Sequence, residues 1–381
     1  MGNPVTSPTV AEYFAGIGLA RMGLEPLDWR VVWANDISAK KYELYHTFFP
    51  DADRHYLVKD IFDVDPASVP LTTLATCSFP CIDLSLAGNM NGMSGDHSSA
   101  FWGFIKILKA QGEVAPPLLL VENVPGWLYS NKGADFRLTI QALNQLGYVC
   151  DVFTLDALRF TPQSRLRVFL VATRLQGNKN PHLILSRPPS LLPDQLRKSV
   201  FANSDLGWFY NELPAPPPLR SSGLAKIIES ISDDDDRWWH EDEVKRHLHM
   251  MEAAHYQRVT QLVAHEEAAY RTFFRRRRKG QQRAEVRPDD LSGCLRTAVG
   301  GSGKQFLIKA GGGQLKMRAM TPREYARLQG VPDEYPITVN GVQALTGFGD
   351  AVCVPVITWI AQHVLNPLFE KHLLNQEVQL A

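Results

Sequence analysis

The feature that most constrains this chain is an alternation of short β-rich runs with helical stretches between residues 8 and about 175. Several of the runs are continuously apolar, which is typical of strands covered on both faces. The seven runs are Thr9–Phe14, Arg30–Asn35, His55–Val58, Leu71–Cys77, Leu118–Val121, Tyr148–Leu155 and Arg167–Thr173. Strands separated by helices predict a doubly wound α/β sheet.

A different pattern interrupts this alternation. Apolar residues recur at spacings of three and four from Glu241 to Phe274, which predicts an amphipathic helix. The helix is expected to end in the basic run Arg275–Lys279. We therefore predict a large α/β domain with a smaller domain inserted into it. The predicted boundaries are 1–175 and 317–381 for the large domain and 176–316 for the insert.

The composition narrows the class of protein. The chain has 381 residues, 45% of them hydrophobic and 21% charged, with 40 Lys and Arg against 40 Asp and Glu. This excludes a mostly disordered chain, although zero net charge leaves room for a local nucleic-acid-binding patch. Five cysteines, an odd number, favour a reducing compartment. With no secretory signal and no apolar run near the roughly 20 residues that cross a membrane, we expect a cytoplasmic protein.

The first three predicted strands end in residues suited to a ligand. Gly16 and Gly18 form a G-x-G turn after the first strand, and Asp36 follows Gly16 by 20 residues. An acid at that distance accepts hydrogen bonds from ribose hydroxyls. Asp60-Ile61 ends the third strand at the same edge. Together these features favour an adenosine-containing cofactor over the alternatives, an ordinary strand–helix turn and two solvated acids.

The fourth predicted strand leads into Ser78-Phe79-Pro80-Cys81. This places Cys81 on a loop beside the cofactor crevice, where a thiol can act as a nucleophile. An inert buried cysteine is the alternative. Cys77 and Cys81 lack a second ligand pair at zinc-finger spacing, so we predict no metal site.

Two further segments bring charged groups to the same edge. Glu122 follows the fifth strand, and its carboxyl group can exchange a proton if a dry pocket raises its pKa. Arg165 and Arg167 lie two residues apart, so they share one face of an extended segment. Such a pair can hold a phosphate or a polarised carbonyl, and a surface salt bridge is the alternative.

In this order, the segments resemble those of the DNA (cytosine-5)-methyltransferases of the bacterial restriction–modification or solitary type. The resemblance covers roughly residues 11–175 and 290–365. The segments that carry it are Phe14–Gly18, Asp36, Asp60-Ile61, Pro80-Cys81, Glu122-Asn123-Val124, Gln163–Arg167, Thr321–Glu324 with Leu328–Gly330, and Gly349–Val352.

The resemblance implies a Rossmann-like fold, S-adenosylmethionine as cofactor and S-adenosylhomocysteine as product. The residues it assigns to the cofactor are Phe14, Gly16, Ile17, Gly18, Asp36, Ile37, Asp60, Ile61, Ser78, Pro80, Asp350, Ala351 and Val352. It also implies that Cys81 attacks carbon 6 of a flipped-out cytosine while protonated Glu122 hydrogen-bonds to ring nitrogen 3. Arg165 would then hold the base carbonyl or a phosphate, and Arg167 would support that loop.

In this family the inserted segment reads DNA. The residues expected to meet DNA are Ser85 in the loop after the nucleophile and Arg275, Arg276, Arg277, Arg278, Lys279, Gly301 and Lys304 in the insert. A basic run of this kind binds phosphates, and a solvated helix end is the alternative. The expected partner is double-stranded DNA bound by a monomer, with a cognate restriction endonuclease left open.

The sequence departs from the family pattern at four positions. Ile82 stands where Gln is usual, His97 where Arg is usual, and Asp350 where Asn is usual. Ile37, after the ribose acid, remains compatible with packing on adenine. Asp350 adds a negative charge near the cofactor, and the other two bear on how the gap left by a flipped base is filled.

Two rival functions fit parts of this pattern. The first is an RNA methyltransferase on the same scaffold, against which the long insert with its basic run argues. The second is a methyltransferase-like binding module without catalysis. Such a module would be expected to lose the nucleophile or the acid, and this chain keeps both Cys81 and Glu122.

Overall fold

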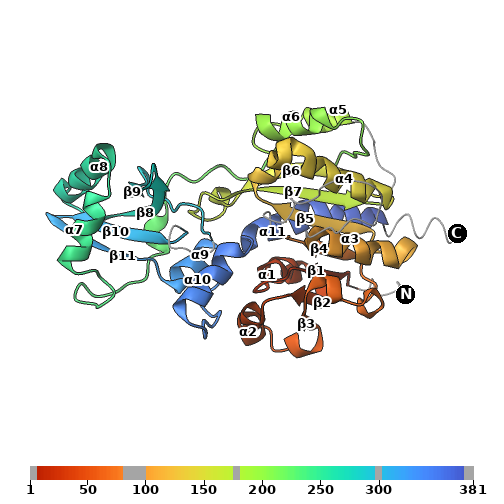
Figure 1. The fold of residues 1–381 in the computed structure, drawn as a ribbon, viewed down its shortest axis with the longest axis horizontal. Coiled ribbons are helices and arrows are strands. Elements are labelled where there is room, and N and C mark those ends of the chain that lie inside the picture. The colour runs from red at the N-terminus through yellow and green to blue at the C-terminus, as the bar shows by residue number, and fades with distance from the viewer. Residues whose placement is uncertain (1–6, 80–99, 175–180, 297–302, 373–381) are drawn as a thin grey trace.

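The computed structural model describes residues 7–79, 100–174, 181–296 and 303–372. Its larger lobe is built on a seven-stranded sheet with the order β3-β2-β1-β4-β5-β7-β6 (Figure 1). The strands are β1 Thr9–Tyr13, β2 Arg30–Asp36, β3 Tyr56–Val58, β4 Leu74–Cys77, β5 Leu118–Asn123, β6 Val149–Asp156 and β7 Leu166–Thr173. Each corresponds to one of the seven predicted runs. Strand β7 is antiparallel to both of its neighbours, whereas β1 to β5 pair in parallel.

Helices cover both faces of this sheet, as predicted for a doubly wound fold. Side chains alternate between the faces, so Val10 packs into one buried cluster and Ala11 and Tyr13 into the other. The first cluster contains side chains from α1 (Leu19–Leu24), α2 (Ala39–Phe48), α10 (Gly341–Asp350) and α11 (Val354–Ile360). The second contains side chains from α3 (Ala100–Gln111), α4 (Ala134–Gln145), α5 (Pro181–Leu185) and α6 (Asp194–Ala202).

The smaller lobe lies to one side of the large sheet (Figure 1). It holds an antiparallel sheet of order β11-β10-β8-β9 with a core around Phe273, Phe306 and Val259. Its strands are β8 Ala269–Arg278, β9 Gln281–Val286, β10 Gln305–Gly311 and β11 Gln314–Ala319. Two helices complete it, α7 Glu241–His249 and α8 Ala253–Ala264.

The prediction of one amphipathic helix over 241–274 is wrong. The segment forms α7, α8 and the first half of β8, because Met251 pairs with β9 and Phe273 pairs with both neighbouring strands. The basic run is therefore the end of a strand rather than of a helix. Lys279 and Gly280 both have positive φ, 48° and 78°, as in the tight turn of a β-hairpin.

Packing also moves the predicted boundaries of the insert. Helices α5 and α6 and the buried Trp208 pack with the large sheet, so the chain from 181 to about 208 belongs to the larger lobe. At the other end, β11 carries the small sheet on to Ala319, past the predicted boundary at 316/317. A buried ion pair of 2.8 Å between Arg318 and Glu324 then joins β11 to α9 (Pro322–Leu328).

The C-terminal helical run Gly341–His372 is apolar and long enough to cross a membrane, but 72% of its most apolar stretch is buried within the protein. Its buried side chains belong to the core under the large sheet, as Phe348 and Ile357 illustrate.

Candidate active site

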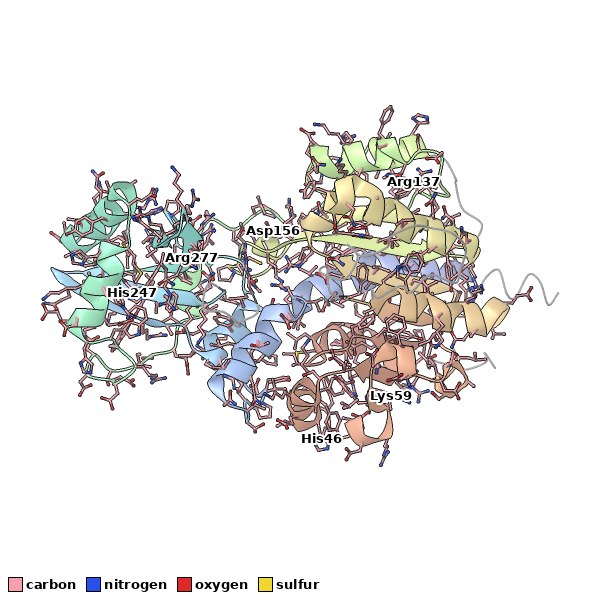
Figure 2. All side chains as sticks on the ribbon, in the orientation of Figure 1. His46, Lys59, Arg137, Asp156, His247 and Arg277 are labelled. Carbon is pink, nitrogen blue, oxygen red and sulfur yellow. The ribbon has the colours of Figure 1, made fainter. Side chains whose placement is uncertain are left out.

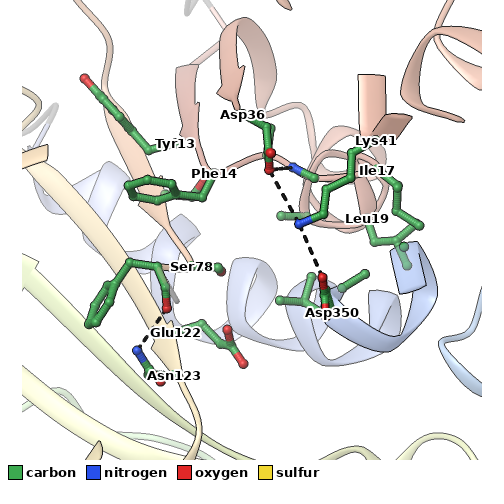
Figure 3. A pocket seen from close by; sticks show the side chains of 18 of the residues that line it. Tyr13, Phe14, Ile17, Leu19, Asp36, Lys41, Ser78, Glu122, Asn123 and Asp350 are labelled. Carbon is green, nitrogen blue, oxygen red and sulfur yellow. Dashed lines mark hydrogen bonds and ion pairs between the residues drawn. The ribbon is translucent and has the colours of Figure 1, made fainter. Parts of the chain in front are cut away.

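A cavity of about 860 Å³ opens at the carboxyl ends of the parallel strands (Figure 3). Residues from β1, β2, β4 and β5 line it together with the end of α10. It brings together these predicted residues: Phe14, Gly16, Ile17, Asp36, Ile37, Asp60, Ile61, Ser78, Glu122, Arg165, Arg167, Asp350, Ala351 and Val352. Pro80, Cys81, Ile82, Ser85, His97 and Gly301 lie outside the described residues.

The glycine loop between β1 and α1 is held in an uncommon backbone conformation. Phe14, Gly16 and Gly18 have φ of 58°, 59° and 80°. For the non-glycine Phe14 this costs on the order of 1 kcal/mol or more, and such strain is found mainly at functional sites. Gly18 is not among the residues that line the cavity, so its contact with the cofactor stays a prediction. Its role is in the turn, because a β-carbon there would lie 2.7 Å from the rings of Tyr45 and Phe49.

Asp36 is fixed at the cavity wall by the backbone around it. One carboxylate oxygen accepts a hydrogen bond from the amide of Gly16 at 3.0 Å, and the other accepts one from the amide of Ser38 at 2.9 Å. The side chain is only 7% exposed. The acid predicted from its spacing to Gly16 is therefore bonded directly to that glycine, which sets its position relative to the loop.

Glu122, at the end of β5, forms an ion pair with Arg167. The Nε atom of Arg167 lies 2.9 Å from Oε1 of Glu122, and both side chains are nearly buried. The pair exists because β7 runs antiparallel beside β5, which places the start of β7 next to the end of β5. Arg167 therefore holds the predicted acid directly rather than supporting a loop.

Arg165 has a different role from the predicted one. The residue is 3% exposed, and its guanidinium donates hydrogen bonds to the carbonyls of Leu295 at 2.8 Å, Gly349 at 3.2 Å and Ala351 at 2.7 Å. Burial lowers its pKa, and the neighbouring Arg167 adds to this effect. With its two terminal nitrogens committed to backbone carbonyls, Arg165 ties segments of the chain together at the cavity. Arg165 thus links distant segments, and Arg167 makes the contact with Glu122.

Comparison with known proteins decides the family. A family model described as C-5 cytosine-specific DNA methylase matches residues 9–366. The chain belongs to this family. It is therefore a methyltransferase that uses S-adenosylmethionine to methylate carbon 5 of cytosine in DNA.

Curated relatives of this methyltransferase match along most of their length. The Type II methyltransferase M.DsaV of Dactylococcopsis salina is 27% identical over 356 residues, which cover 93% of this chain and 85% of that one. The Type II methyltransferase M.NlaX of Neisseria lactamica is 28% identical over 363 residues, covering 93% and 95%.

Solved structures share the fold at lower identity. The S. pombe Dnmt2 methyltransferase superposes with a TM-score of 0.61 at 18% identity, covering 95% of this chain and 99% of that one. A putative DNA modification methyltransferase encoded within an E. coli prophage gives a TM-score of 0.56 at 16% identity, with the same coverage.

The cavity of this methyltransferase fits the cofactor of its family. Its volume is in the range of roughly 300–1,000 Å³ typical of small-molecule sites, and Asp36 and the apolar Ile37 and Ile61 line it. Glu12, which the sequence analysis missed, also lines it from β1. Glu12 is 2% exposed, and within the described part of the chain its Oε2 atom has no hydrogen-bond partner. An unpartnered buried oxygen suits a ligand with a donor group. In the sequence, the feature that could have identified Glu12 is a charged residue inside a predicted buried strand.

Other residues that the sequence analysis missed complete the wall. Asn123 donates a hydrogen bond from its amide to the carbonyl of Phe79 at 3.2 Å, which holds the end of the chain segment after β4 (Figure 3). Cys294 and Arg296 reach the cavity from the segment that precedes β10. Lys41, from the first turn of α2, lies between Asp36 and Asp350 (Figure 3).

The predicted DNA-binding arginines are not equivalent in the smaller lobe. Arg275 packs over the ring of Phe306 at 4.8 Å, and Arg276 and Arg278 both pair with Glu285. Arg277 is exposed and lies on the hairpin of β8 and β9 (Figure 2). Lys304 immediately precedes β10, whose register places it beside Arg275.

The buried carboxyl group of Glu12 predicts a pH-dependent stability. Burial raises its pKa from 4.5 to about 8, with Arg21 opposing the shift. The folded protein therefore keeps a proton that the unfolded chain loses. The free energy of unfolding should fall as the pH rises from about 4.5 towards 8, by up to about 1.4 kcal/mol per pH unit. Glu12→Gln removes this contribution, so its stability relative to wild type should increase between pH 5 and pH 8 in urea denaturation without cofactor.

The control is Glu113→Gln, since Glu113 is exposed and does not line the cavity. A stability difference between Glu12→Gln and wild type that stays constant from pH 5 to pH 8 would show that Glu12 does not hold a proton in the folded state.

Proposed function

We propose that this methyltransferase acts on cytosines within a specific double-stranded DNA sequence through a covalent adduct with Cys81. The observation that supports this most is the Glu122–Arg167 pair in the wall of the cavity that also holds Asp36. The chain after β4 leads from Phe79, which Asn123 holds, to Cys81 two residues later. Glu122, the cofactor cavity and Phe79, which precedes Cys81 by two residues, therefore lie at one edge of the sheet.

The chemistry follows from the electronics of cytosine, whose carbon 5 is too poor a nucleophile to react unaided. The Cys81 thiolate adds to carbon 6, and the electron pair of the ring double bond makes carbon 5 nucleophilic. Arg167 occupies Oε1 of Glu122, so Oε2 is the oxygen that carries a proton and donates it in a hydrogen bond to ring nitrogen 3 as negative charge develops there. When bound, S-adenosylmethionine supplies the electrophilic methyl group. Loss of the carbon 5 proton and of the thiolate then restores the aromatic ring.

A cytosine stacked in a duplex cannot reach this cavity. We infer that the target nucleotide is flipped out, at a cost of a few kcal/mol in lost stacking and pairing. Arg296, exposed at the cavity and next to the segment leading to β10, is placed to meet the backbone of such a nucleotide.

The covalent step can be tested with a DNA duplex in which 5-fluorocytosine replaces cytosine. The duplex is copied with 5-fluoro-dCTP in place of dCTP from a template that contains every short sequence, so that the recognition sequence is included. Fluorine cannot leave carbon 5 as a proton does, so the thioether to Cys81 should persist after methyl transfer. We expect a denaturation-resistant protein–DNA complex that depends on S-adenosylmethionine and maps to Cys81 by mass spectrometry. Glu122→Gln should slow its formation by about 10²- to 10⁴-fold.

Cys81→Ala is the control, and it should bind S-adenosylhomocysteine as wild type does. A complex that still forms in Cys81→Ala, or that maps to another residue, would contradict the mechanism.

We also propose that the smaller lobe contacts the DNA backbone through its basic hairpin, residues 275–281. Glu285 offsets part of the charge of Arg276 and Arg278, which leaves Arg277 and Lys279 at the turn as the cations best placed for phosphates. Ser85 and Gly301 remain predicted contacts, and so does Lys304. We further propose that the enzyme is a monomer, uses no metal and acts in the cytoplasm. A cognate restriction endonuclease is left open.

The hairpin proposal predicts the salt dependence of DNA binding. Arg277→Gln with Lys279→Gln should weaken binding and lower the slope of log K against log salt by about 0.9 for each phosphate that the protein no longer neutralises. Arg54→Gln, which removes an exposed charge from the larger lobe, is the matched control. An unchanged slope in the double variant, measured by fluorescence anisotropy over roughly 50 to 200 mM salt, would show that the hairpin does not touch DNA.

A further inference from the structure

Lys41 connects two carboxylates that come from opposite ends of the chain. Its Nζ atom lies 3.4 Å from Oδ2 of Asp350 and 3.8 Å from Oδ2 of Asp36. Its side chain is 26% exposed, against 33% for Asp350 and 7% for Asp36. Figure 3 shows the ammonium group between the two acids at the wall of the cavity.

Both members of the Lys41–Asp350 pair stand at unfavourable positions in their own helices. Lys41 lies in the first turn of α2, where the helix dipole disfavours a positive charge. Asp350 is the last residue of α10, where the dipole disfavours a negative charge. Because α2 and α10 pack against each other, each charge offsets the other. Such a departure from local preference is expected at functional sites rather than in plain scaffold.

The pair also brings together two segments that line the cavity. The Cδ atom of Lys41 lies 4.0 Å from the position that a β-carbon on Gly16 would take, so its alkyl chain passes beside this residue of the glycine loop. Asp350 ends α10 and lies in the segment Gly349–Val352 (the final loop), whose carbonyls at 349 and 351 accept from Arg165. All three of Lys41, Asp36 and Asp350 line the cavity.

We propose that Lys41 is a positioning residue for the cofactor that acts through Asp350. It fixes the final loop against the glycine loop and offsets the negative charge that Asp350 brings to the cavity. The charge balance matters because the methyl donor carries a positive sulfonium that the product lacks. This inference deepens the assignment of the cavity to S-adenosylmethionine and rests on it.

A double-mutant cycle in the full-length enzyme without DNA tests this role. The variants are Lys41→Met, Asp350→Asn and the double variant, with binding of S-adenosylmethionine and S-adenosylhomocysteine measured by isothermal titration calorimetry. Lys41→Met should weaken binding of the product by about three- to tenfold. It should weaken binding of the donor less, because the uncovered carboxylates attract the sulfonium. In the Asp350→Asn background, adding Lys41→Met should change the product affinity by less than about twofold.

Two controls separate position from charge. Lys40→Met removes the neighbouring exposed lysine, which does not line the cavity, and should leave both affinities unchanged. Lys41→Arg keeps the charge and should restore the wild-type ratio of the two affinities. Thermal unfolding of each variant without ligand shows that the fold is retained.

Two results would overturn the proposal because Lys41 would then not act through Asp350. One is an equal loss of affinity for donor and product, and the other is a loss of the same size in the wild-type and Asp350→Asn backgrounds. Unchanged binding in Lys41→Met would overturn it too. If wild type bound neither ligand, the cofactor assignment itself would fall, a result distinct from the others.

Discussion

The site depends on one buried cation. Among the described residues, the guanidinium of Arg165 meets no carboxylate and is held instead by carbonyls from two distant segments, at Leu295 and at Gly349–Ala351. A buried charge is costly unless it is hydrogen-bonded, so these segments cannot move away from Arg165 without a large penalty. The planar guanidinium presents its donors from separate nitrogens in a fixed fork, whereas a lysine would offer a single ammonium nitrogen.

Two buried glutamines reinforce this junction. Gln163 donates to the carbonyl of Leu328 at 2.9 Å and accepts from the amide of Leu295 at 3.2 Å. Gln329 donates to the carbonyls of Phe348 and Ala351. The segment returning from the smaller lobe and the final loop are thus fixed to the same point. This arrangement frees Arg167, two residues beyond Arg165, to hold Glu122 at the cavity.

Much of the fold and of the cavity could be predicted from sequence. The seven strands were visible because buried parallel strands are continuous apolar runs, and the cavity residues because parallel strands end at one edge. The antiparallel direction of β7 could not be predicted, because a buried apolar run has the same pattern in a parallel and in an antiparallel strand. That direction brings the start of β7 beside the end of β5, so the Glu122–Arg167 pair could not be predicted from the sequence. The prediction of one helix over 241–274 was wrong because the spacing of Tyr270 and Phe273 is compatible with a helix. It is also compatible with a strand that is paired on both sides.

Pairs formed by distant residues were the other limit. The sequence predicted that Asp350 adds a negative charge near the cofactor, because no basic residue is close to it in the sequence. Lys41, at the other end of the chain, meets it only once α2 and α10 pack together. Glu12 lies inside a buried strand and was not recognised as a site residue. Its Oε2 atom has no hydrogen-bond partner among the described residues, and this follows from the packing of the core rather than from the local sequence.

The most direct test of this account compares Arg165→Met with Arg167→Met. We expect Arg167→Met to keep the thermal stability and the S-adenosylhomocysteine affinity of wild type while its single-turnover rate falls by about 100-fold or more. Arg165→Met should instead unfold at a lower temperature and bind the product more weakly. The account would be contradicted if Arg165→Met kept both properties and lost only its rate, while Arg167→Met remained active.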